Sequence, residues 1–83
     1  MAVLMHPLAT EKSVGLIERS NVITYMVDYR ATKPEIKKEF ERIFGVKVAR
    51  IRTLTTPTNG KKAFIKLAEG YSAGDVALKL KIA

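Results

Sequence analysis

The clearest periodic pattern of the chain lies between Thr32 and Phe44, where apolar residues recur at the spacing of one helix face. These apolar residues are Ile36, Phe40, Ile43 and Phe44. Thr32 and Glu35 have the spacing of a capping box, and Pro34 falls in the first turn, where its missing N–H costs nothing. Gly45 then supplies a left-handed stop. The pattern predicts a helix over Thr32–Phe44 whose apolar stripe faces a core.

The sequence upstream of this helix predicts two strands and a shorter helix. Val3–Met5 is a short apolar run that Pro7 stops, and Val22–Asp28 alternates like a strand with one buried face. Between these strands, Thr10 caps a predicted helix over Glu11–Arg19. The side chains expected to point inward are Val14, Ile17, Ile23, Tyr25 and Val27.

The second half of the chain predicts a β-hairpin. Val46–Thr55 is rich in β-branched residues, but its alternation slips between Val48 and Ile51, which indicates a bulge or a later strand start. Asn59-Gly60 is a strong hairpin dipeptide, and Lys61–Leu67 returns as the next strand.

The last segment fits two patterns. Ser72 and Asp75 have the spacing of a helix cap, which favours a helix. Its apolar residues also alternate as in a strand, at Val76, Leu78, Leu80 and Ile82. With a final helix, the order of elements is β-α-β-α-β-β-α. This order predicts an α+β sandwich with a mainly antiparallel four-stranded sheet, in one domain over residues 1–83.

The composition argues against several classes of function. The chain has no cysteine, its only histidine is His6, and its five glycines are scattered. The chain therefore lacks the residues for a thiol nucleophile, for a histidine-based metal or catalytic site and for a glycine-rich phosphate loop. We expect no enzymatic activity, metal or cofactor. The longest apolar run is far below the ~18–20 residues of a membrane span, and no charged segment precedes it. We expect a cytoplasmic protein without membrane insertion.

The net charge of +7 is the most informative number, because it is concentrated in one half of the chain. Residues 1–41 hold equal numbers of basic and acidic side chains, so residues 42–83 carry the whole surplus. Between Arg42 and Ala68 there are seven basic residues and no acidic one. Such an uncompensated cluster indicates an anionic polymer as the partner.

The predicted hairpin carries the main candidates for RNA binding. They are Arg50, Arg52, Lys61, Lys62, Phe64 and Lys66. Alternation puts Lys62, Phe64 and Lys66 on one face, as a cation, an aromatic ring and a cation. Cations neutralise phosphates, and an aromatic ring gives a base or ribose a stacking surface. The alternative is that Phe64 belongs to a second small core beneath the last helix, with the lysines as edge protection.

A second kind of RNA-binding protein also fits this strand. Residues 63–67 match the tail of the longer RNP motif of RNA-recognition-motif domains, although Lys62 stands where the first aromatic belongs and Leu67 where the last belongs. A free single-strand RNA-binding regulator is therefore the alternative function.

Four motifs, in order and in register, resemble a known family. They are Pro7–Ser13 (PLATEKS), Asp28–Lys37 (DYRATKPEIK), Phe44–Val48 (FGVKV) and Gly60–Leu67 (GKKAFIKL). The chain resembles large-subunit ribosomal protein family number twenty-three over essentially its whole length. The short connection Thr55–Lys61 looks like that of the archaeal or eukaryotic-core members.

The resemblance implies a structural ribosomal protein, monomeric within the ribosome, that binds large-subunit ribosomal RNA beside neighbouring ribosomal proteins. It also implies a docking platform at the polypeptide exit tunnel for the signal recognition particle, nascent-chain chaperones and the protein-conducting channel. The family's docking motif corresponds to Thr10, Glu11 and Lys12. Because this helix is electrically balanced, we expect it to face away from RNA. The alternative for Glu11 is that it only complements the helix dipole.

The start of the Thr32–Phe44 helix is the second place where the residues and the resemblance both predict RNA. Arg30, Thr32 and Lys33 surround this helix start, where free N–H groups would suit a phosphate. Simple capping by Thr32 is an equal alternative. Lys37 is a further candidate contact, although it could equally be a solvated partner of Glu41.

Overall fold

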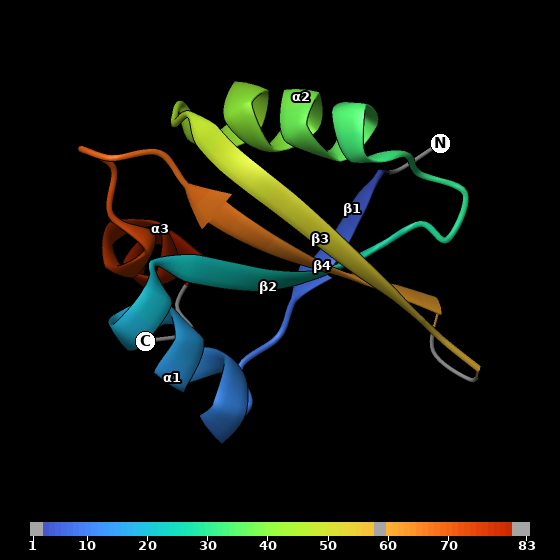
Figure 1. Ribbon diagram of the computed structural model, residues 1–83, viewed down its shortest axis with the longest axis horizontal. Helices are drawn as coiled ribbons and strands as arrows, with labels where there is room; N and C mark the ends of the chain where they lie inside the picture. Colours follow the sequence, from blue (N-terminus) through green and yellow to red (C-terminus); the bar gives the residue numbers. More distant parts are fainter. Residues whose placement is uncertain (1–2, 58–59, 81–83) are drawn as a thin grey trace.

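The computed structural model describes residues 3–57 and 60–80, and in these ranges the chain forms three helices and a four-stranded sheet (Figure 1). The elements in chain order are β1 (Leu4–Pro7), α1 (Glu11–Ser20), β2 (Val22–Val27), α2 (Lys33–Phe44), β3 (Val48–Thr56), β4 (Gly60–Leu67) and α3 (Ala73–Leu80). The predicted α+β class and order are confirmed. The last segment, which fitted both a helix and a strand pattern, forms a helix. Ile82 lies outside the described residues.

The helix boundaries follow the predicted caps. The hydroxyl of Thr10 accepts the Ser13 N–H at 3.2 Å, and α2 begins with the complete capping box of Thr32 and Glu35. Gly45 ends α2 in the left-handed conformation, at a φ of 65°. Asn21 does the same for α1 at a φ of 57°, so that helix runs one residue past the predicted end. Over the described ranges, every helix is too short or too polar to cross a membrane.

The sheet has the strand order β1-β2-β4-β3, and each neighbouring pair is antiparallel. β1 includes Pro7, which was predicted to stop it, because the last residue of an edge strand can do without a ladder N–H. β3 begins at Val48 and shifts register between Val48 and Arg50, so the predicted slip reflects both a late start and an irregularity. The predicted turn residue Asn59 lies outside the described residues.

The core lies on the face of the sheet that α2 and α3 cover. Ile36 and Phe40 of α2 are fully buried, and the Phe40 ring meets the Tyr25 ring edge-on with centroids 6.3 Å apart. The prediction that Ile43 belongs to this stripe is wrong, because Ile43 is 50% exposed. It lies about 60° from Phe40 around the helix. Phe44 of the same last turn lies on the other side of Phe40. Its ring packs against the Phe40 ring, with the two ring centroids 4.6 Å apart.

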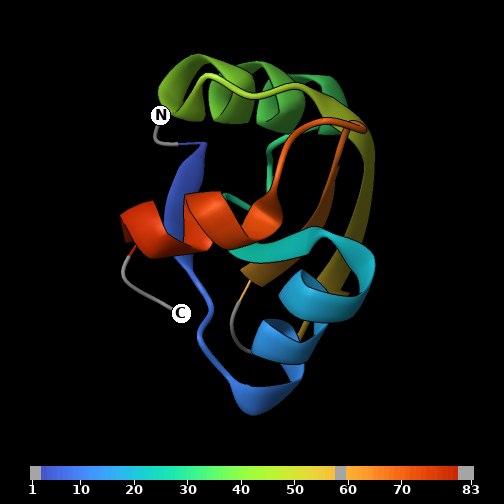
Figure 2. The same cartoon turned by 90° about the vertical axis from the view of Figure 1, so that its left-hand side faces the viewer.

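The two faces of the sheet differ in character. Ala63, Ile65 and Leu67 of β4 point into the core and are at most 2% exposed. The intervening side chains point to the opposite face, which we call the outer face. Helix α1 contacts both β2 and α3. Figure 2 shows α2 along the top of the molecule, α3 across the middle and α1 below, beside the start of β2.

Candidate nucleic-acid interface

The outer face of β3 and β4 carries four of the predicted cations and the predicted aromatic ring. In the antiparallel register Arg50 pairs with Lys66, and Arg52 pairs with Phe64. Lys62 follows on the same face, so these five residues form one surface, which we call the basic face. Arg50, Arg52 and Lys66 are exposed, whereas Lys62 and Phe64 are half-buried. Paired side chains lie within ~4.5–5.5 Å at Cβ, so the cations are close neighbours.

No carboxylate neutralises this surface in the described part of the chain. The ion pairs recorded there are Arg30–Asp28 and Arg42–Glu39, and neither involves the basic face. Like charges on neighbouring strands repel each other, which destabilises the sheet unless a counter-charge is present. A phosphate backbone supplies such a counter-charge and gains from the release of its own counterions.

A hollow of about 470 Å³ opens on the basic face, with Arg50, Arg52, Phe64 and Lys66 in its lining. Its other walls come from α1 and β2, which contribute Leu16, Ser20 and Val22. Leu54, which is 53% exposed, lines it from β3. The hollow therefore combines apolar side chains from several elements with three cations.

The basic surface continues around the edge of the sheet toward α2. A second hollow, of about 360 Å³, lies between α2 and the edge strand β3. Lys33 and Lys37 of α2 line it together with Arg50. Because Arg50 lines both hollows, Lys33 and Lys37 adjoin the basic face as one band of positive charge.

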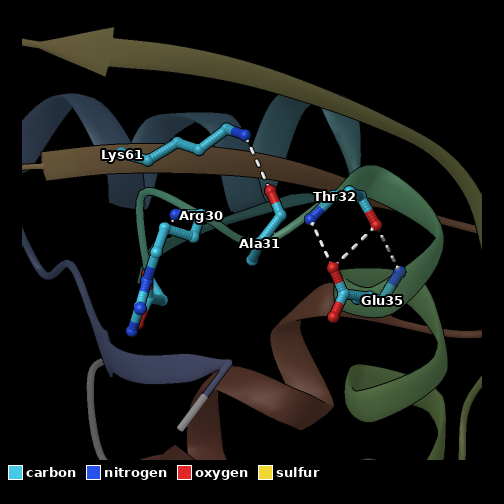
Figure 3. Close-up of polar contacts among 6 residues, drawn as sticks. Arg30, Ala31, Thr32, Glu35 and Lys61 are labelled. Atoms are coloured by element: carbon cyan, nitrogen blue, oxygen red, sulfur yellow. Dashed lines mark hydrogen bonds and ion pairs between the residues drawn. The ribbon is translucent and has the colours of Figure 1, made fainter. Parts of the chain in front are cut away.

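Side chains at the start of α2 form hydrogen bonds with the backbone N–H groups there (Figure 3). The Glu35 carboxylate accepts hydrogen bonds from the Thr32 N–H at 3.0 Å and from the Thr32 hydroxyl at 2.9 Å. The N–H and then the hydroxyl of Thr32 hold the pKa of the Glu35 carboxyl below its ordinary value. The Glu35 N–H is bonded to Thr32 and Pro34 has no N–H, so the Lys33 N–H is the donor of this first turn that has no partner among the described residues. The capping role of Thr32 is therefore confirmed, and the predicted phosphate site at this helix start keeps one backbone donor beside the side-chain cations.

Two other predicted cations near this helix start already have partners. Arg30 bonds the Asp28 carboxylate at 3.3 Å through Nε, and this hydrogen bond lowers the pKa of Asp28. Lys61 points to the core side of the sheet, away from Lys62, and its ammonium donates to the Ala31 carbonyl at 2.7 Å. Figure 3 shows this bond linking β4 to the loop before α2. Lys61 is thus separated from the basic face and has a structural contact of its own.

The predicted docking motif lies at the start of α1. Thr10 is its N-cap, and Glu11 and Lys12 are exposed in its first turn. The other end of α1 reaches the hollow through Leu16 and Ser20. The balanced charge of α1 predicted that this helix faces away from RNA. The structure instead places one end of α1 beside the basic face.

Comparison with known proteins identifies the family. The family profile described as Ribosomal protein L23 matches residues 2–70. Large ribosomal subunit protein uL23 of Methanothermobacter thermautotrophicus is 44% identical over 81 residues, which span 98% of this chain and 94% of that protein. The chain belongs to the ribosomal protein L23 family. The resemblance of its four motifs is confirmed, and the chain is a ribosomal protein.

Sequence reasoning missed part of the hollow of this L23-family chain. Leu54 could have been found, because it continues the alternation of Arg50 and Arg52 on the outer face. Leu16 and Ser20 gave no such signal. Their place in the hollow depends on how α1 packs beside β2, and nothing in the helix pattern itself specifies that contact.

Proposed function

We propose that this protein is a structural, non-catalytic constituent of the large ribosomal subunit, at work on cytoplasmic ribosomes. Membership of the L23 family supports this proposal, and its archaeal relative is named as a large-subunit protein. We propose further that it binds large-subunit ribosomal RNA through the basic face. The observation that carries this step is the group of four cations around Phe64 on one sheet face, without a neutralising carboxylate among the described residues.

The chemistry of the basic face favours contact with the RNA backbone. Each phosphate that a Lys or Arg neutralises adds ~0.7–0.9 to the slope of log affinity against log salt. Four cations therefore predict a slope of about −3 to −4 for this face alone. Lys33 and Lys37 extend the same band around the β3 edge and would add to the slope if the RNA follows it.

The test of the main proposal is sedimentation of ribosomes from cells that make this protein. We expect it to remain with the large subunit after a high-salt wash that removes loosely bound proteins. Recovery with small RNAs or messenger RNA, and none with the large subunit, would instead favour the free single-strand RNA-binding regulator.

The start of α1 is the proposed docking site for factors at the tunnel exit. These factors are the signal recognition particle, nascent-chain chaperones and the protein-conducting channel. The exposed carboxylate of Glu11 supports this, because RNA would repel it whereas a basic patch on a protein would attract it. In the ribosome, Glu11→Lys should leave subunit assembly intact and reduce recruitment of at least one factor.

Glu18 provides the matched control for this test, since it is an exposed glutamate of the same helix. Ribosomes with Glu18→Lys should recruit factors as well as unmodified ribosomes do. Equal loss of recruitment in both variants would show a general charge effect, and no loss in either would remove Glu11 from the docking site.

A further inference from the structure

The hollow on the basic face has a chemistry that a phosphate backbone alone does not explain. A backbone contact needs only exposed cations, and Arg50, Arg52 and Lys66 supply them. The same hollow is also lined by Leu16, Val22, Leu54 and Phe64. These side chains offer nothing to a phosphate, whose transfer to apolar surroundings is costly.

We infer that this hollow receives a single unstacked nucleobase of the ribosomal RNA, an inference that rests on the proposed RNA binding. The half-buried ring of Phe64 offers the base a stacking surface, and Leu16 and Val22 offer it apolar walls. RNA-binding proteins recognise unpaired bases mainly in this way, by stacking them on aromatic rings or guanidinium planes. The volume of about 470 Å³ lies within the ~300–1,000 Å³ of pockets that hold small organic groups.

The charges around the hollow decide which ligand fits. Its three cations lie among the apolar residues, and none of the described residues that line it is acidic. A base carries its own phosphates into such a site, so the cations meet a charge of opposite sign. An apolar peptide segment would leave these cations without a counter-charge. Charge complementarity therefore favours an RNA nucleotide over an apolar peptide segment.

The pairing of Arg52 with Phe64 suggests how the base is held. The two residues are direct cross-strand neighbours on the outer face, so the guanidinium and the ring adjoin the same space. Among the described residues, the lining has no amide or carboxylate, and its donors to a base edge are the hydroxyls of Ser20 and Thr53 and the three cations. Stacking itself accepts any base, so a base preference of the site would come from these donors.

The experiment compares two ligands of equal length and equal charge on the full chain. One is an eight-nucleotide single-stranded oligoadenylate, and the other is the matching abasic octamer. We expect the oligoadenylate to bind about 5- to 150-fold more tightly, the range that one stacked base provides. In NMR spectra it should also shift the methyl resonances of Leu16 and Val22, which the abasic octamer leaves in place.

Phe64→Leu tests the stacking step, because leucine keeps an apolar side chain but removes the ring. It should lower oligoadenylate affinity to near that of the abasic octamer, without weakening the abasic octamer itself. Tyr29→Leu is the matched control, since Tyr29 is 68% exposed and lies outside the lining of the hollow. That control should bind both ligands as the unmodified chain does.

The possible failures are distinguishable. Equal, salt-dependent binding of both octamers, or tighter binding of an RNA duplex than of the single strand, would overturn the base site and leave the proposed RNA binding standing. Binding of neither octamer at low salt would overturn the electrostatic proposal as well.

Discussion

Lys61 and Lys62 are adjacent in sequence, but their side chains lie on opposite faces of the sheet. The Lys61 ammonium lies 2.7 Å from the Ala31 carbonyl and ties β4 to the loop before α2. Lys62 lies on the basic face, and the described residues offer it no carboxylate. We predict that Lys61→Met lowers stability with little effect on RNA binding, and that Lys62→Met does the reverse.

The magnitude for Lys61 follows from its hydrogen bond. Bonds to charged groups contribute ~1.5–3 kcal/mol, and a half-buried ammonium retains part of its hydration, so we expect a loss of about 1–2 kcal/mol. Methionine keeps most of the apolar stem, so the loss reports mainly on the bond. In a domain of this size it corresponds to a fall in Tm of about 4–16 °C.

Lys62→Met is the matched variant. Surface changes of this kind stay within ~0.5 kcal/mol, so its Tm should barely move. It should instead reduce the salt slope of binding to a large-subunit ribosomal RNA fragment by ~0.7–0.9, the contribution of one phosphate contact.

The assays are thermal unfolding followed by circular dichroism and RNA titrations at several salt concentrations. An unchanged Tm together with a reduced salt slope for Lys61→Met would refute the reasoning. That result would mean that Lys61 faces RNA and that its bond to Ala31 contributes little in solution.

Three further predictions concern the fold that supports the interface. Thr32→Ala removes the cap of α2 and should lower the free energy of unfolding by ~0.5–2 kcal/mol in urea titrations. Ile65→Val removes one buried methylene and should cost ~0.5–1.5 kcal/mol in the same assay without changing RNA affinity. The folded-state pKa values of Glu35 and Asp28 are lowered, so the stability that these carboxylates provide is present above their ordinary pKa and is lost as the pH falls below ~4. Urea titrations across this pH range should show that decline, and Glu35→Gln should make it shallower.

Local patterns were enough to predict most of the fold. The caps Thr10 and Thr32 and the stop at Gly45 act through bonds within a few residues, so their spacing alone predicted both helix starts and the end of α2. Alternation assigned Ala63, Ile65 and Leu67 to the core in the same way. These predictions succeeded because each depends on one element and its immediate neighbours.

The sequence pattern did not predict the contacts between helices, strands and loops. The bond from Lys61 to Ala31 joins residues 30 positions apart, and the wall that Leu16 adds to the hollow depends on the packing of α1. The exposure of Ile43 likewise depends on what lies opposite the last turn of α2. Charge clustering indicated the proposed interface, whereas the tertiary structure divided the clustered cations between the basic face and the loop before α2.

Lysine acetylation in intact large subunits tests the central claim, that the basic face meets ribosomal RNA, most directly. The reagent would be applied to the subunit, to the free protein and to the subunit after ribonuclease digestion, and each lysine would be quantified by mass spectrometry. We predict that Lys62 and Lys66 are protected in the subunit and become reactive after digestion, while Lys12 reacts in all three samples. Equal reactivity of Lys62 and Lys66 in the subunit and in the free protein would contradict the account.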